Sequence, residues 1–262
     1  MNKLRLAPSA LVIATGLALA GCSGVGSASS GSPSAAGPSG SASSGADATA
    51  AGTAASSQAA SPTASASPKS YSTAELGTIL AGLTDAEGNP LTAVPADQLE
   101  TGIAAAKQML SAAVITPAEC AALVDTNGQI PAGGTYAGGA AKSAAGQSLT
   151  TVTLVSVTDP AVLAKGAAAA KDNTSKCANY TVELQGKKIT GKTEILPVQT
   201  GGDASFGSLT TQGVLDGPAT QTAVVTGVKG GLSVSAVAIG QNVSRDSAAA
   251  LAKIVSDALA HS

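Results

Sequence analysis

The strongest chemical motif in the chain is the run Gly186–Thr193, which fits the phosphate-binding pattern G-x-x-x-x-G-K-[ST]. That motif binds phosphate when a strand leads into the loop and a helix follows, because backbone N–H groups and the helix dipole then meet the anion. A strand-like segment does precede the run, but an extended segment broken by Pro197 follows it. We therefore predict a lysine-rich hairpin turn here and no nucleotide site.

A serine nucleophile is also weakly supported. Ser205 stands in the run Asp203–Gly207, which lacks the first glycine of the nucleophile elbow G-x-S-x-G. Its base would have to be His261, the second-last residue, where fraying is expected. No lysine has a serine three residues before it, so the S-x-x-K motif of penicillin-recognising enzymes is absent. We expect no catalytic residues and no enzyme.

One acidic loop has the spacing of a calcium site without its essential residues. Asp85, Glu87 and Asn89 alternate like the start of an EF-hand loop. Pro90 stands where the EF-hand glycine should be, and Ala96 where its bidentate glutamate should be. We expect a polar loop that ends in an Asn-Pro turn, with no metal and no other cofactor.

Composition narrows the possible partners. The chain has three tyrosines, one phenylalanine and no tryptophan, so it cannot bind nucleic acid by stacking bases on aromatic rings. Charged residues make up 11% of the chain and the formal net charge is −2. That charge is too small to steer a partner and argues against a polyphosphate one. We expect no nucleic-acid partner.

The N-terminus has the three parts of an export signal. Lys3 and Arg5 give a positive start, and the apolar stretch 6–20 is shorter than a membrane span. The closing run L-A-G-C, which ends at Cys22, resembles the lipobox of bacterial lipoproteins. The resemblance implies cleavage before Cys22, diacylglycerol on its sulfur, and a lipid anchor on the extracytoplasmic face of the cell membrane. The alternative is an ordinary signal peptide followed by a cysteine by chance.

The other two cysteines, Cys120 and Cys177, would then lie outside the cytoplasm, where disulfides form. A bond between them would close a long loop and could stabilise the fold by up to about 4 kcal/mol. Two buried free thiols are the alternative. No histidine lies near either cysteine and there is no C-x-x-C pair, so a zinc site is poorly supported.

Composition divides the chain into three parts. Residues 1–21 form the lipoprotein signal peptide. In the tether, residues 22–70, Ala, Ser, Gly, Pro and Thr fill every position after Cys22 except four. Such a segment has too little to bury to offset its ordering entropy, and as a random coil it would span roughly 35–40 Å. Residues 71–262 then make one globular domain.

Within this domain, caps and periodicity predict several helices. Ser72 and Glu75 form a capping box that starts the first helix. A second helix is predicted over 96–112, and a third from the cap Thr116 to Asn127. Further helices are predicted from the pair Asp159-Pro160 to about residue 171, and after Ser244 or Asp246 at the end of the chain.

Strands are predicted over 149–157, 179–185, 189–198, 219–228 and 232–239, and the glycine-rich stretch 133–146 reads as a loop or an edge strand. The order of helices and strands favours an α+β fold: a mostly antiparallel sheet with helices packed on one face and one disulfide.

Two segments resemble the PknH-like extracellular sensor domains of actinobacterial lipoproteins and receptor kinases. One is Pro117–Cys120 after a leading helix; the other is a valine-rich strand, 234–239, followed by a polar cap and an alanine-rich last helix. The resemblance implies a sheet with helices on one side, a cleft for an unidentified ligand, and pairing of Cys120 with Cys177.

The function expected is therefore a membrane-anchored, extracytoplasmic ligand-binding or sensor module. Its small side chains would leave room for a small apolar or envelope-derived ligand, between the sheet and its helices or on the concave face of the sheet. The alternative is a cell-envelope structural or accessory protein that works through contact with an envelope protein.

Overall fold

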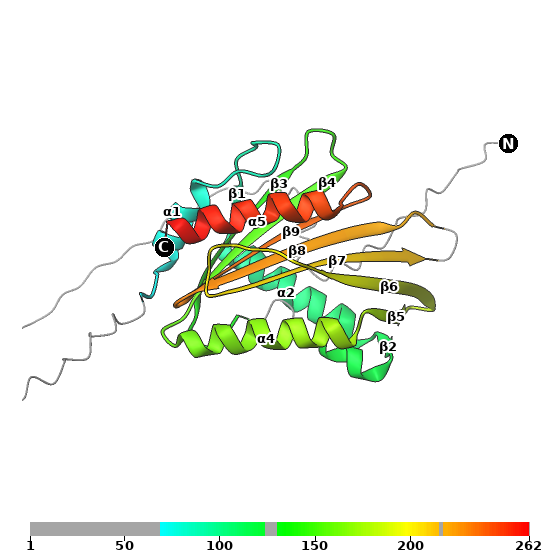
Figure 1. The fold of residues 1–262 in the computed structure, drawn as a ribbon. Helices are drawn as coiled ribbons and strands as arrows, with labels where there is room; N and C mark the ends of the chain where they lie inside the picture. Colours follow the sequence, from blue (N-terminus) through cyan, green and yellow to red (C-terminus); the bar gives the residue numbers. More distant parts are fainter. Residues whose placement is uncertain (1–68, 124–129, 215–216, 262) are drawn as a thin grey trace, which may run out of the picture. The chain divides into compact units, whose positions relative to one another are not determined.

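A computed structural model describes residues 69–123, 130–214 and 217–261. They build a nine-stranded sheet with every neighbouring pair antiparallel, in the order β1-β3-β4-β9-β8-β7-β6-β5-β2 (Figure 1). The strands are β1 (Thr92–Val94), β2 (Val114–Thr116), β3 (Thr135–Lys142), β4 (Ser148–Ser156), β5 (Asn179–Leu184), β6 (Lys187–Leu196), β7 (Ala204–Val214), β8 (Thr220–Lys229) and β9 (Leu232–Gly240).

The helices of the described chain are α1 (Thr73–Ala81), α2 (Ala96–Ser111), the short 3-10 helix η1 (Ala118–Ala121), α4 (Pro160–Lys176) and α5 (Arg245–Ala260). The capping box predicted for α1 is present: the Ser72 hydroxyl accepts the Glu75 N–H, and the Glu75 carboxylate accepts the Ser72 N–H. The α+β class, the antiparallel sheet and the disulfide are confirmed. None of the described helices is long and apolar enough to cross a membrane.

Helices lie on both faces of the sheet, although they were expected on one. Two neighbouring glycines of β3 show this, because successive residues of a strand point to opposite faces. A Cβ added at Gly139 would meet Leu80 of α1, whereas one at Gly138 would meet Leu99 of α2. Both residues are glycines because a helix side chain packs directly against the backbone there.

The same argument separates α5 from α4. A Cβ added at Gly227 of β8 would meet Val255 and Leu259 of α5, whereas the next residue, Val228, packs in a cluster with Leu163 of α4. We call the side with α1 and α5 the α5 face, and the side with α2 and α4 the α4 face.

The main hydrophobic core lies on the α5 face. It joins α1 and α5 to the inward residues of β4, β8 and β9, among them Val152, Val225, Val234 and Leu251. All four of these side chains are at most 2% exposed. A second apolar cluster lies on the α4 face around the disulfide, and a small third one lies under the first half of α4.

Both edges of the sheet are short and bounded by proline. The edge strand β1 lies between Pro90 and Pro95, and the edge strand β2 ends directly before Pro117. Proline has no N–H to offer to a further strand, so an edge of this kind is a poor template for pairing.

The predicted elements match the structure well, except for one helix and four strands. The helix predicted from Thr116 is wrong at its start, because Thr116 pairs with Thr181 in β2, a 3-10 turn follows Pro117, and α-helical backbone begins only at Ala122. The residue before a proline favours an extended backbone, which suits a strand better than a helix cap. Residues 124–129 lie outside the described chain.

The other differences concern the strands β3, β7, β1 and β2. The glycine-rich stretch predicted as a loop or edge strand contains β3, an inner strand between β1 and β4. The strand β7 lies between two predicted strands in a region for which none was expected, and β1 and β2 were not expected either.

Candidate functional site

The most unusual region of the interior is a set of polar side chains buried on the α4 face. Strands β6, β7 and β8 place these side chains next to one another through the pairs Thr193 with Thr210 and Thr210 with Thr222. Each is at most 9% exposed. We call this set the polar layer: Thr193, Ser208, Thr210, Gln212 and Thr222.

Some of these polar groups form hydrogen bonds within the described chain, and one has no partner there. The hydroxyls of Thr193 and Thr210 lie 2.9 Å apart and share a hydrogen bond. The Gln212 side-chain amide donates to the hydroxyl of Tyr180 at 3.0 Å. The Thr222 hydroxyl is fully buried and has no hydrogen-bond partner within the described chain. An unpaired buried hydroxyl lowers the stability of the fold by about 1–3 kcal/mol. A polar partner for the Thr222 hydroxyl would therefore be stabilising.

The phenol of Tyr180 stands at the border of the polar layer and the apolar cluster around the disulfide. Burial raises the pKa of Tyr180 above its ordinary value of 10.0, because the phenolate is poorly solvated there, and the hydrogen bond from Gln212 lowers it in part. Tyr180 is therefore neutral at physiological pH, so its hydroxyl has a proton to donate as well as lone pairs.

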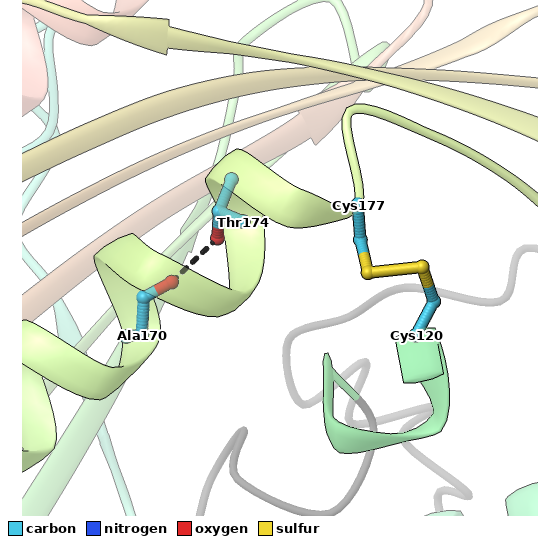
Figure 2. Close-up of a disulfide and its surroundings, with 4 residues drawn as sticks. All are labelled: Cys120, Ala170, Thr174 and Cys177. Atoms are coloured by element: carbon cyan, nitrogen blue, oxygen red, sulfur yellow. Dashed lines mark hydrogen bonds between the residues drawn. A yellow bond between two sulfur atoms is a disulfide. The ribbon is translucent and has the colours of Figure 1, made fainter. Parts of the chain in front are cut away.

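Helix α4 covers these strands with small side chains. It contacts β6, β7, β8 and β9, yet only Leu163 and Thr174 of its seventeen residues are buried. The Thr174 hydroxyl donates back to the carbonyl of Ala170 at 2.8 Å, as Figure 2 shows. It therefore bonds its own helix and not the polar layer.

The C-terminal end of α4 is fixed by a disulfide. Cys177 caps the helix and bonds to Cys120 of η1, with the Cα atoms 5.5 Å apart (Figure 2). Both cysteines are buried, at 0% and 2% exposure, among apolar residues that include Val182, Leu184 and Ile189. The predicted pair is confirmed, and the alternative of two free thiols is excluded in this structure.

The run that resembles a phosphate-binding loop is a β-hairpin. Gly186 has a positive φ of 74° in the turn between β5 and β6, and residues 187–196 form β6. Thr193 belongs to the polar layer on this strand. Because no helix begins after the glycines, the backbone N–H groups pair with neighbouring strands and do not converge on an anion.

The remaining motifs have structural roles. Ser205 lies on β7, and its hydroxyl bonds that of Thr200 at 2.7 Å. The Asp85 carboxylate accepts the backbone N–H groups of Glu87 and Asn89 and so closes its own loop. No group of three His, Cys, Asp or Glu side chains among the described residues is arranged to hold a metal ion. Cys22, the predicted lipidation site, lies outside those residues.

The polar layer could not be found from single residues, because serine, threonine and glutamine are common on surfaces. A signal did exist in β7, where Ser208, Thr210 and Gln212 alternate within a strand that continues a sheet. Their burial depends on α4, which sequence periodicity alone does not place on this face.

Comparisons with known proteins give a loose likeness. No family model matches the chain, and no curated protein does. Among solved structures, the extracellular domain of PknH from Mycobacterium tuberculosis is 12% identical over 74% of this chain and 99% of that one, with a TM-score of 0.48. A putative uncharacterized protein, the Rv0999 ortholog from Mycobacterium smegmatis, is 16% identical over 57% and 75%, with a TM-score of 0.37. These two structures agree with the loose resemblance predicted from the sequence.

Proposed function

We propose that the protein is a membrane-anchored, extracytoplasmic binding module whose ligand sits between α4 and the polar layer. The observation that carries the proposal is the fully buried Thr222 hydroxyl without a partner, in a layer of four other buried polar side chains. A packed core favours apolar residues at such positions, because buried polar groups are costly unless paired. A ligand with hydroxyl or carbonyl groups would supply the missing partner.

The packing of α4 supports a route for such a ligand. The helix faces the polar layer with two buried side chains along seventeen residues, so lifting it from the sheet exposes little apolar surface. Its C-terminal end stays fixed by the bond from Cys177 to Cys120. Regions with few buried apolar contacts open at low free-energy cost, which is what ligand entry requires.

The chemistry of the neighbouring side chains suggests an amphiphilic ligand. Next to the polar layer, β7 also carries Phe206 on the α4 face, and β8 carries Val224. A small envelope-derived molecule with a polar group and an apolar part matches this mixture better than a purely apolar one. We propose binding without catalysis. The Ser205 hydroxyl is hydrogen-bonded to that of Thr200, and the Asp85 carboxylate is hydrogen-bonded to the backbone of its own loop.

Location outside the cytoplasm rests on two features of the chain. The lipobox-like run ending at Cys22 predicts lipidation, and the disulfide from Cys120 to Cys177 is typical of an oxidising compartment. Two acyl chains on Cys22 would give a stable anchor, whereas one chain is marginal. Intact mass and fractionation of the full chain and of Cys22→Ala test this: the variant should lose both the lipid mass and the membrane association.

The binding proposal is tested on the full chain, purified in mild detergent from its own host and analysed by native mass spectrometry. We expect a bound small molecule of defined mass. Thr222→Val and Thr210→Val should reduce its occupancy, because each removes a hydroxyl while keeping the shape. Thr92→Val is the matched control, since Thr92 is an exposed threonine on the edge strand β1, away from the polar layer.

Repeated preparations without any bound molecule would overturn the proposal, and so would equal losses of occupancy in all three variants. If the preparations are empty and crosslinking in cells captures one reproducible envelope protein, the accessory role replaces ligand binding.

A further inference from the structure

The α5 face carries a second polar region, on the half of the sheet that α1 and α5 leave largely uncovered. Helix α5 packs on β8 and β9, and α1 packs on β1, β3 and β4. On the other half of the sheet, β5 and β2 have no substantial contact with either helix, and β6 meets them only near its end, through Glu194 and Leu196. A hollow of about 460 Å³ opens on this uncovered half.

Strand register arranges the lining of the hollow in two rows. The first row runs across three neighbouring strands through Thr116, Thr181 and Thr190, which pair with one another in order. The second row pairs Asn179 with Lys192 and Lys192 with Thr211. Neighbouring strands lie about 4.8 Å apart, and residues two apart on a strand about 6.8 Å, so these six side chains form a compact grid of hydrogen-bonding groups.

The floor of the hollow is open because of a glycine. Gly213 continues the first row on β7, paired with Thr190, and a Cβ added there would meet nothing within 4 Å. The Thr190 hydroxyl donates to the Gly213 carbonyl at 3.3 Å, which orients it within the row. A side chain at position 213 would partly fill the hollow.

Lys192 gives this grid its charge. Among the described residues that line the hollow, Lys192 is the one that carries a charge, and none is a carboxylate. The ion pairs of the described chain do not include Lys192, and the nearest acid along its strand and face, Glu194, is bound by Arg245. The residues paired with Lys192 on the neighbouring strands, Asn179 and Thr211, carry amide and hydroxyl groups that can donate hydrogen bonds to an anion.

We propose that this hollow binds a phosphate or carboxylate group carried on a hydroxylated, sugar-like ligand, with Lys192 opposite the anion and the threonine rows along the hydroxyls. The hollow is open and polar, which suits an exposed group of a larger envelope molecule better than a small ligand that must be enclosed. It lies on the opposite face from the polar layer, so the proposal does not depend on the ligand beneath α4.

The test is a titration of the isotope-labelled full chain by NMR, with three probes: glycerol 3-phosphate, glucuronate and uncharged glucose. We expect saturable shifts in the backbone amides of 179–181, 190–192 and 211–213 with the two anions and not with glucose. Which anion binds more tightly separates a phosphate ligand from a carboxylate one. Added salt should weaken the binding, because the site is exposed.

Two variants give the decisive contrast. Lys192→Gln should weaken anion binding about tenfold, because charge-assisted hydrogen bonds are roughly twice as strong as neutral ones. Lys188→Gln is the matched control: it lies on the same strand and face, outside the hollow, opposite Glu183. Thr190→Val should give a smaller loss.

Equal effects of Lys192→Gln and Lys188→Gln would show nonspecific attraction and overturn the proposal. Shifts that appear with glucose as strongly as with the anions, or no saturable shift in the hollow, would overturn it as well. These readouts are independent of any molecule bound at the polar layer, so the two proposals can fail separately.

Discussion

Helices α5 and α4 cover opposite faces of the same central strands, and they do so in different ways. Six of the sixteen residues of α5 are buried, all of them apolar, whereas α4 buries one leucine and one threonine among seventeen. The strands beneath follow the same division, since β8 and β9 give α5 valine and alanine while β6 and β7 give α4 threonine, serine and glutamine.

This difference shows how one sheet can serve two purposes. The α5 face supplies the apolar burial that stabilises the fold. On the α4 face, a covalent bond holds one end of α4. The polar strands beneath this helix therefore do not have to stay dry for the helix to remain in place. The disulfide thus adds to the small apolar clusters of the α4 face, at the place where we propose that a ligand enters.

The largest effect should come from the α5 face. Leu251→Ala leaves a cavity under α5 and should lower the free energy of unfolding by about 2–5 kcal/mol. Leu163→Ala, the matched change in α4, should cost less than half as much, because Leu163 belongs to a small cluster with few buried members. Denaturant unfolding measures both, and equal losses would contradict the division between the two faces.

The next effect concerns the covalent bond. Replacing Cys120 and Cys177 together by alanine should lower the free energy of unfolding by about 2–4 kcal/mol, because the bond spans 57 residues of sequence. Hydrogen exchange should show the loss of protection concentrated in α4 and η1. If α5 lost protection to the same degree, the bond would stabilise the whole domain evenly and α4 would need no special support.

A smaller contrast lies within the polar layer. Thr210→Val breaks the hydrogen bond with Thr193 and should cost about 1 kcal/mol. Thr222→Val removes a buried hydroxyl without a partner, so without ligand it should be neutral or stabilise by up to about 1 kcal/mol. Unfolding of ligand-free protein distinguishes them. A clear loss of stability in Thr222→Val would mean that its hydroxyl already has a partner.

The smallest effect is a dependence on alkaline pH. The pKa of Tyr180 is raised by burial, so the folded chain keeps this proton at a pH at which the unfolded chain releases it. The contribution of Tyr180 to stability is therefore complete below pH 10.0 and is lost as the pH rises through its folded pKa. Unfolding from about pH 9 to about pH 11 should show a steeper decline in the wild type than in Tyr180→Phe.

Most of the fold could be predicted from the sequence because local signals were strong. The Ser72 capping box, the Asp159-Pro160 start of α4 and the Ser244 cap of α5 each satisfy backbone groups at a helix end, and the structure has all three. Strands such as β4 and β9 are rich in β-branched residues and bounded by glycine, so their ends agree within about two residues.

What could not be predicted depended on contacts between distant segments. Strand β7 has small or polar residues on both faces, with Ser208 and Thr210 on the α4 face and Gly207 and Thr211 on the other, so no sustained row of apolar residues marks it. Strand β3 contains Gly138 and Gly139 because helices approach from both sides, and glycine usually indicates a loop. The polar layer could not be predicted for the same reason, because its burial depends on α4. The Cys120–Cys177 pair could be predicted because the export signal and the number of cysteines are read directly from the sequence.

The proline-bounded edge strands β1 and β2 have a consequence at the proposed location. Anchored molecules would share a plane, where they meet far more often and in fewer orientations than in solution. A sheet with a long open edge would act there as a monomer with two reactive ends and could grow into a ribbon. The prolines beside these edges hinder pairing with the strand of another molecule, so crowded domains remain separate molecules; these prolines are Pro90, Pro95 and Pro117.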